Sequence, residues 1–324
     1  MTRKQALATV KSKSPTVYTE AARKYARKSK ADNTIRMYRS AWAEFQRFAE
    51  ARGVPSLPAS PATVIDFITA LADGGAKVST IQVKLAAVAS AHRTAKATDP
   101  TTDEDVRLVM AGIRRAKGIA PSKKAPITLD ELRALVNALP DTLAGKRDRA
   151  LLLTGFAGAF RRSELIGVDV ADMHVNGKMT IRVRRSKTDQ EGKGITKVIP
   201  PIDDAAIDPL RALREWLGAA GIKSGPVFRQ IDRWGHVRDA RLTSQSVALI
   251  VKTAAERAGL EPRQFAGHSL RSGFITEAAS AGVEDRDIAA QTGHKSMIVL
   301  HGYIQDAGLG AMGAVKAAFG QRAK

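Results

Sequence analysis

Apolar residues recur every three or four positions through most of the first 117 residues, the spacing of amphipathic helices. The clearest case runs from Asn33 to Gly53, where one face carries Ile35, Tyr38, Trp42, Phe45 and Phe48. The same period, with Ser, Pro and Gly at the expected ends, predicts further helices over 60–74, 79–97 and 102–117. No strand pattern interrupts them, so residues 15–117 are predicted to form a compact all-helical domain.

Two stretches without periodicity flank this domain. Residues 1–14 are basic and contain Ser and Thr, and we expect a loose N-terminal arm. Residues 118–126, GIAPSKKAP, combine two prolines, a glycine and a lysine pair, a composition typical of a linker. The pattern therefore predicts a second domain over residues 127–324.

The second domain has mixed periodicity. A capping box at Thr128 and Glu131 opens a helix, and the nearly all-apolar stretch from Arg147 to about Phe160 predicts a buried one. Extended runs over 173–200, joined first by Asn176-Gly177, predict a small antiparallel sheet. An arginine-rich stretch over 229–241 is interpreted as a loop. The expected fold class is mainly α, with an all-helical first domain and a mixed α/β second domain.

Short helices are expected near the C-terminus, because Gly282 and Gly293 are suited to end helices and Ser296 is suited to begin one. Residues 305–324 form a further stretch with helical spacing, and they predict a tail helix with one apolar face: Leu309, Met312, Val315 and Phe319. This helix could pack on its own domain or on a neighbouring subunit.

Composition adds a partner class. The 324 residues are 44% hydrophobic, enough for a substantial core, and 52 Lys plus Arg against 32 Asp plus Glu give a formal charge of +20. Such a field favours a polyanion, nucleic acid before an anionic membrane surface, although a merely basic soluble protein has the same totals.

Other classes are excluded or made less favourable. The absence of cysteine excludes disulfides, thiol nucleophiles and Cys-ligated zinc. The longest apolar run, over 151–160, is too short to span a bilayer, and the N-terminus has no apolar secretion-signal core. A cytoplasmic protein is therefore expected.

Candidate chemistry is concentrated in residues 265–303. His268 and Arg271 are three positions apart and share one face of a helix. His294 follows Gly293 directly. Tyr303 is the one tyrosine outside the first forty residues, so any phenol chemistry in this region belongs to it.

These residues resemble the tyrosine recombinases, the lambda-integrase, Cre and Xer family of DNA strand-exchange enzymes. The matches are HSLR at 268–271, GH at 293–294, and Tyr303 nine residues after that histidine. The segment AGAFRRSELIGV over 157–168 resembles the family's Gly-x-Arg-x-Ser-Glu-Leu, which implies Arg161 as a catalytic arginine and Glu164 as its supporting acid. Lys187, in Ser-Lys-Thr, matches the family's hairpin lysine. The alternatives are Arg162 for Arg161, Lys193 for Lys187 and His301 for His294.

The resemblance implies metal-free chemistry without a cofactor. Tyr303 would attack the phosphorus and form a 3′-phosphotyrosine, while Arg161 and Arg271 bind two phosphoryl oxygens. Lys187 would protonate the departing 5′ oxygen. His268 would assist proton transfer from Tyr303 or bind the phosphate, and His294 would donate to a non-bridging oxygen.

The resemblance also implies a DNA partner with paired inverted half-sites, bound by a homotetramer that exchanges strands through a Holliday junction and is monomeric when free. Basic residues between the apolar positions of the first domain could contact DNA or be ordinary solvated positions: Arg36, Arg39, Lys77, Lys84, Arg93 and Lys96. The rival functions are a type IB topoisomerase, a catalytically silent DNA-binding protein on the same fold, and a metal-dependent nuclease using the histidines.

Overall fold

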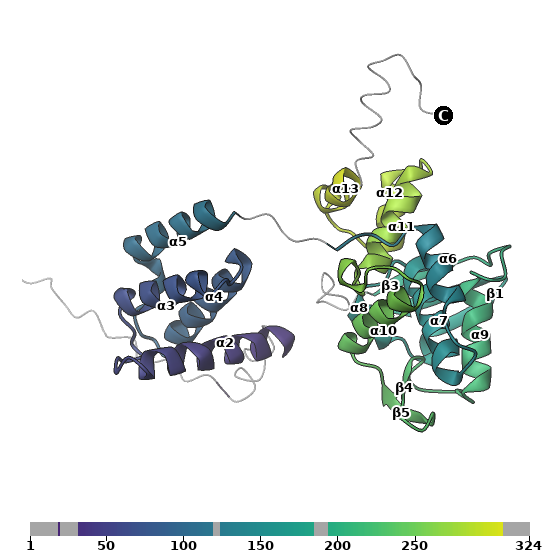
Figure 1. Cartoon of the computed structure of the whole chain (residues 1–324), viewed down its shortest axis with the longest axis horizontal. Helices are drawn as coiled ribbons and strands as arrows, with labels where there is room; N and C mark the ends of the chain where they lie inside the picture. The colour runs from purple at the N-terminus through teal and green to yellow at the C-terminus, as the bar shows by residue number, and fades with distance from the viewer. Residues whose placement is uncertain (1–18, 20–31, 119–123, 185–193, 307–324) are drawn as a thin grey trace, which may run out of the picture. The chain divides into compact units, whose positions relative to one another are not determined.

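The chain divides between Ser122 and Lys123 into two compact units. The computed structural model describes residue 19 and residues 32–118, 124–184 and 194–306 (Figure 1). The predicted basic arm, the loop with Lys187 and Lys193, and the tail after residue 306 lie outside the described residues. No helix in the described part of the chain is long and apolar enough to cross a membrane.

The first unit is all-helical in its described residues, as the periodicity predicts. Its helices are α2 (Asp32–Glu50), α3 (Pro61–Asp73), α4 (Val78–Thr94), the 3₁₀ turn η1 (Pro100–Thr102) and α5 (Glu104–Lys117). Ser60 caps α3 by accepting a hydrogen bond from the Thr63 amide at 3.1 Å, and proline follows at the first helical position. The predicted start at Thr102 is wrong by two residues, because Asp103 caps α5 instead.

Aromatic rings form the centre of this unit. Phe45 and Phe67 are buried and meet edge to face, with ring centroids 5.1 Å apart. His92 is fully buried beside them; its Nε2 accepts from the Ala59 amide and its Nδ1 donates to the Val88 carbonyl, both at 2.9 Å. Both ring nitrogens are satisfied, so His92 has a structural role.

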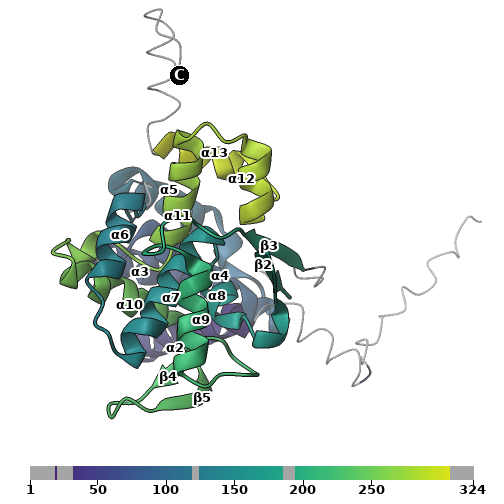
Figure 2. The same ribbon diagram turned by 90° about the vertical axis from the view of Figure 1, so that its right-hand side faces the viewer.

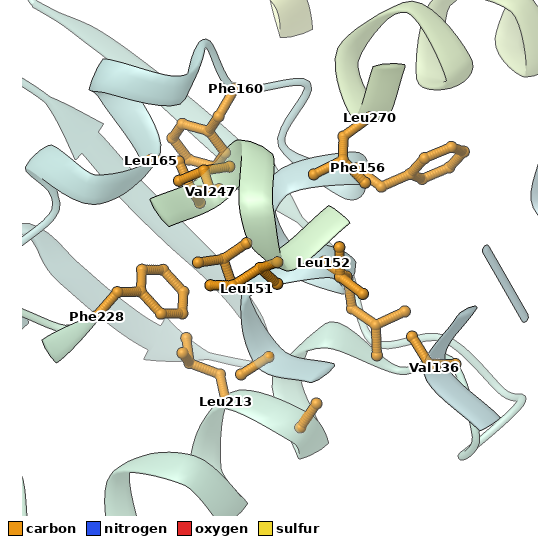
Figure 3. Packing of buried hydrophobic residues seen from close by; sticks show 14 of the residues in the cluster. Val136, Leu151, Leu152, Phe156, Phe160, Leu165, Leu213, Phe228, Val247 and Leu270 are labelled. Carbon is orange, nitrogen blue, oxygen red and sulfur yellow. The ribbon is translucent and has the colours of Figure 1, made fainter. Parts of the chain in front are cut away.

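The second unit has a helical core around α7. Its helices and 3₁₀ turns are α6 (Leu129–Asn137), α7 (Leu143–Ala157), α8 (Arg162–Gly167), η2 (Val170–Asp172), α9 (Pro209–Ala219), α10 (Ser244–Arg257), η3 (Pro262–Gln264), α11 (Ser269–Ser280), α12 (Asp285–Thr292) and α13 (Met297–Asp306). Helix α7 is buried as predicted, but it begins at Leu143 rather than Arg147 because Thr142 caps it. Figure 3 shows Leu151 and Leu152 of α7 among side chains from several other elements.

The predicted sheet is present. Strands β1 (Met173–Asn176), β2 (Lys178–Val183) and β3 (Ile195–Ile199) pair antiparallel in the order β1-β2-β3, so β3 is an edge strand. The Asn176-Gly177 turn joins the first two, with Asn176 opposite Lys178.

The interpretation of residues 229–241 as a loop is wrong, because they form a second hairpin of β4 (Arg229–Ile231) and β5 (Val237–Arg241). One oxygen of Asp232 accepts from the amides of Trp234 and His236 at 2.9 Å each and closes the turn. The arginines of this hairpin form ion pairs, Arg229 with Asp239, Arg238 with Asp232 and Arg241 with Asp169. This hairpin and the α12–α13 pair lie at opposite ends of the unit (Figure 1, Figure 2).

The end of the predicted linker is attached to the second unit. The Ala125 amide donates to the Gln264 carbonyl at 2.9 Å, and the Ile127 amide donates to the Ser269 carbonyl at 3.0 Å. Gly273 permits this close passage over α11, because a Cβ there would lie 2.0 Å from the Ile127 carbonyl oxygen. Residues 124–126, predicted as linker, therefore pack on the second unit and help to anchor α11.

Candidate active site

Arg161 lies in the turn between α7 and α8, held by a buried carboxylate. Its Nη1 donates to Glu164 Oε1 at 2.6 Å, and its backbone amide donates to Glu164 Oε2 at 2.9 Å. Glu164 is buried, and the Arg161 side chain is 18% exposed, whereas Arg162 is exposed. Of the two neighbouring arginines, Arg161 is therefore the one fixed in orientation.

The backbone before Arg161 is unusual. Ala159 has φ of +46°, in the left-handed region that costs a residue with a Cβ on the order of 1–2 kcal/mol. When the segment is set against the motif Gly-x-Arg-x-Ser-Glu-Leu, Ala159 stands at the position of the glycine, a residue that adopts this φ without strain. The conformation directs the Ala159 carbonyl toward Arg271, whose Nη1 donates to it at 2.7 Å.

Arg271, on α11, is 1% exposed and connects three segments. Its Nη1 donates to the carbonyls of Ala159 and Thr292, each at 2.7 Å, and its Nη2 lies 3.0 Å from His294 Nε2. Burial and the nearby Arg161 lower the pKa of Arg271 to about 10, so it remains charged at neutral pH. These contacts hold a planar cation in one orientation between the turn before α8 and the end of α12.

His294 is placed by the end of α12. Gly293 has φ of +73° and ends the helix, and His294 then turns its ring toward Arg271. Thr292 Oγ1 donates to the Ile288 carbonyl at 2.7 Å, so it accepts from His294 Nδ1 at 2.8 Å. Burial and the Arg271 charge lower the pKa of His294 to about 4, consistent with a neutral ring whose Nε2 accepts from Arg271.

Tyr303 on α13 meets His268 at the start of α11. The Tyr303 hydroxyl lies 2.7 Å from His268 Nε2, and the Tyr303 ring centroid lies 5.7 Å from that of His294. Partial desolvation, and then the charges of Arg271, Arg161 and Arg162, lower the pKa of His268. A neutral His268 can accept the phenol proton, which is the geometry of a general base.

Helix α13 is held by a small contact set. Leu300 is fully buried against Ile275 and Ile288, and His301 Nε2 lies 2.7 Å from Asp285 Oδ2. His301 thus contacts the first turn of α12 rather than Arg271. His294, and not His301, occupies the position beside the arginine.

Sequence reasoning missed Lys197 on β3. It is 1% exposed, its Nζ donates to the Gln291 carbonyl, and burial followed by the Arg271 charge lowers its pKa to about 7. The sequence could have indicated its burial, because residues along a strand alternate between faces and Lys197 is on the same face as Ile195 and Ile199. Lys187 and its alternative Lys193 lie outside the described residues.

The basic residues of the first unit differ in their surroundings. Lys84 forms an ion pair with Glu44 that joins α4 to α2, and its side chain is only 15% exposed. Arg93 pairs with Asp99 at 2.8 Å but remains 63% exposed. The other four are exposed: Arg36, Arg39, Lys77 and Lys96.

The histidines do not combine with carboxylates into a ligand cluster. Over residues 32–118, 124–184 and 194–306, no group of three or more His, Cys, Asp or Glu side chains could hold a metal ion. His268 and His294 instead contact Tyr303 and Arg271.

The lowered pKa of His268 predicts a pH profile. If His268 acts as base, it must be neutral, so lowering its pKa extends activity to more acid conditions. The second-order rate of strand cleavage, which reports the free enzyme, should therefore have its acid-side decline centred below the pKa of an ordinary histidine. Single-turnover cleavage at subsaturating DNA between pH 5 and 8 measures this. A decline already centred above the ordinary histidine range would contradict a desolvated His268.

Comparison with solved structures agrees with this arrangement at the level of fold. A lambda integrase dimer bound to a COC′ core site superposes with a TM-score of 0.60 at 20% identity, covering 87% of this chain and 74% of that one. The Tn1549 transposon integrase, in complex with transposon right-end DNA, gives 0.60 at 15% identity and covers 91% and 97%. The chain therefore shares the fold of these two proteins.

Sequence comparison identifies the family. The Phage integrase family pattern matches residues 126–308, and its N-terminal SAM-like domain matches residues 23–98. An integrase/recombinase XerD homolog from Selenomonas ruminantium is 41% identical over 289 residues, 88% of this chain and 84% of that protein. Tyrosine recombinase XerD of Rhizobium meliloti is 25% identical over 280 residues, 84% of each chain. The chain belongs to the phage integrase family of tyrosine recombinases, enzymes of site-specific DNA recombination.

Proposed function

We propose that this enzyme cuts and rejoins DNA through a 3′-phosphotyrosine on Tyr303 and exchanges strands through a Holliday junction. The observation that carries the proposal is the Tyr303 hydroxyl 2.7 Å from His268 Nε2, in a site that also holds Arg271 and Arg161. Because Tyr303 and His268 belong to the same chain, each protomer would cleave with its own nucleophile.

The proposed cleavage step needs neither a metal ion nor ATP. The phenol proton passes to His268 Nε2 as Tyr303 Oη attacks the phosphorus, and the bond from phosphorus to the 5′ oxygen breaks. Lys187 would give the departing oxygen its proton, since an ammonium can release one and a guanidinium cannot. Rejoining reverses these transfers with a 5′ hydroxyl as the nucleophile.

Arg161 and Arg271 would stabilise the charge that develops on the non-bridging oxygens. Both guanidiniums are oriented before substrate arrives, Arg161 by Glu164 and Arg271 by two backbone carbonyls. A phosphate beside Arg271 would replace His294 Nε2 as its acceptor. His294 would be freed from this bond, and the adjacent anion would favour uptake of a proton at Nε2, which could then donate to a phosphoryl oxygen.

The DNA partner is supported by the charge of +20 and by the relatives. The lambda and Tn1549 integrase structures are complexes with DNA sites. We propose paired inverted half-sites, a tetramer assembled on DNA from free monomers, and a cytoplasmic location where such DNA is found. In the first unit, the proposed phosphate contacts are the exposed Arg36, Arg39, Lys77, Arg93 and Lys96. Lys84, which pairs with Glu44 and is only 15% exposed, is the least accessible of the six predicted residues.

The test is formation of a covalent complex in a chelator. The purified protein is incubated in EDTA with nicked duplexes from the DNA flanking its own gene, and denaturing gels are examined for a protein–DNA adduct. We expect an adduct on a small number of fragments, because a site-specific recombinase cleaves only its own target. The adduct accumulates because the nick lets the short strand leave and traps the intermediate. Adducts on every duplex regardless of sequence would indicate a topoisomerase instead. Tight binding with no adduct on those fragments or on a tiled genomic library would indicate a silent DNA-binding protein.

A further inference from the structure

Gln291, in the last turn of α12, is bonded to two other segments. Its Nε2 donates to the carbonyls of Ala157 and Val198, each at 2.9 Å, and its Oε1 lies 3.4 Å from the Val198 amide. Because β3 is an edge strand, this carboxamide lies where a fourth strand would pair. One side chain thus connects α12 both to the sheet and to the end of α7.

Lys197 makes a second link between the same two elements. It is fully buried on β3, its Nζ donates to the Gln291 backbone carbonyl, and the Phe160 ring centroid lies 5.5 Å away. The last carbonyls of a helix lack intrahelical partners and interact favourably with a cation. Lys197 therefore caps the C-terminal end of α12 from the strand.

The residues that follow Gln291 belong to the active site. The Thr292 carbonyl accepts from Arg271, and Thr292 Oγ1 holds His294 Nδ1. Gly293 supplies the left-handed turn between them. Gln291, which contacts β3, is only three positions before His294, whose ring lies beside Arg271.

We propose that Gln291 and Lys197 are positioning residues that fix the end of α12 to β3 and thereby set the positions of His294 and Arg271. Gln291 and Lys197 also connect His294 and Arg271 to β3, which lies after Lys187 in the chain. The inference rests on the proposed function for what the site catalyses, and on the hydrogen bonds alone for the positioning.

The burial of Lys197 supports a role beyond filling space. Desolvation of its amine is unfavourable, as the lowered pKa of about 7 indicates, and an apolar side chain at the same inward position would avoid that cost. The bond to Gln291, the Phe160 ring and the Glu164 charge are the favourable interactions that oppose this cost. Arg271, Arg161 and Glu164 are the charged groups around it.

The test replaces each residue by methionine, which keeps the length and removes the hydrogen bonds. For Gln291→Met and Lys197→Met we expect single-turnover adduct formation to fall about ten- to a hundredfold, the cost of a misplacement near 1 Å, with DNA affinity within about twofold. NMR of histidine-labelled protein follows His294. In Gln291→Met its pKa should rise from about 4 toward the ordinary 6.5, as the ring becomes less buried and moves away from Arg271 and Arg161. Gln291→Met is the diagnostic variant for this readout, because Lys197→Met also removes a neighbouring charge that lowers the His294 pKa directly.

Matched controls separate positioning from general loss of stability. Gln245→Met and Lys178→Met change the same residue types at exposed positions of the second unit and should leave both readouts unchanged. The double variant should lose little more than the worse single one, since both bonds hold one helix end.

Thermal unfolding confirms that each variant is folded. Folded variants with the wild-type rate and the wild-type His294 titration would overturn the inference. If wild-type protein forms no adduct at all, the proposed function fails, while the His294 titration still tests the positioning.

Discussion

Tyr303→Phe is expected to remove the covalent protein–DNA complex completely while DNA affinity stays within about twofold, because only a hydroxyl is lost. The phenylalanine keeps the ring packed 5.7 Å from His294, so α13 should remain docked. Denaturing gels of the nicked-duplex reaction measure the adduct, and gel shifts measure binding. This is the largest effect predicted, because no other group in the described site can form a phosphotyrosine.

Two variants make the result specific. Tyr38→Phe removes a phenol from the first unit and should retain adduct formation. His268→Asn keeps a polar group at the start of α11 but removes the proton acceptor, and should slow the adduct by about a hundredfold or more without preventing it. An adduct that survives Tyr303→Phe would show that another residue is the nucleophile.

Arg271→Ala is expected to reduce cleavage by about a thousandfold, the upper range for losing one oriented charge-stabilising donor. It should also destabilise the fold, because the Ala159 and Thr292 carbonyls lose their donor, at about 1–3 kcal/mol each. Single-turnover rates at saturating DNA give the first effect, and urea unfolding gives the second. Both effects follow from one guanidinium that is 1% exposed.

The choice of replacement separates the two effects. Arg271→Lys keeps a charge and can bond one carbonyl, so stability should recover in part while the rate stays low, because the ammonium lacks the planar fork. Arg286→Ala is the matched control, since Arg286 is 77% exposed and pairs with Glu284 and Asp287 on the surface. Equal rate losses for Arg286→Ala and Arg271→Ala would contradict a specific role for Arg271.

Sequence signals that depend on neighbours in the chain predicted the fold well. Ser60 and Thr128 cap the helices expected of them, and Asn176-Gly177 makes the expected hairpin turn. The resemblance of HSLR, GH and Tyr303 to the recombinase motifs indicated one site, and the structure brings His268, Arg271, His294 and Tyr303 together. Helix boundaries were less accurate, because a cap such as Asp103 competes with other polar residues one or two positions away.

Features that depend on particular side-chain contacts could not be predicted in this way. Lys197 and Gln291 are 94 positions apart, and neither spacing nor composition indicates that their atoms meet. The preference for Arg161 over Arg162 came from the resemblance, and the structure adds the contact that orients Arg161: Glu164, three residues later, binds its side chain and its amide. The β4–β5 hairpin was not predicted, because its turn depends on one oxygen of Asp232 that accepts from two amides. Its arginines also gave the stretch the composition of a solvated loop.

The small contact set of α13 has a consequence for control. Among its described side chains Leu300 alone is fully buried, a contribution of about 1.5–3 kcal/mol, and the His301–Asp285 pair is half exposed and adds at most about 1 kcal/mol. Tyr303 and Ile304 are partly buried beside Leu300, and the hydrogen bond between Tyr303 and His268 adds about 0.5–1.5 kcal/mol. A partner surface that preferred the detached helix by about 3 kcal/mol would change the ratio of docked to detached Tyr303 by more than a hundredfold. Arg271 has no such freedom, since it is bound on three sides. If Tyr303 is the nucleophile as proposed, cleavage is therefore most easily switched by moving it, with Arg271 left in place.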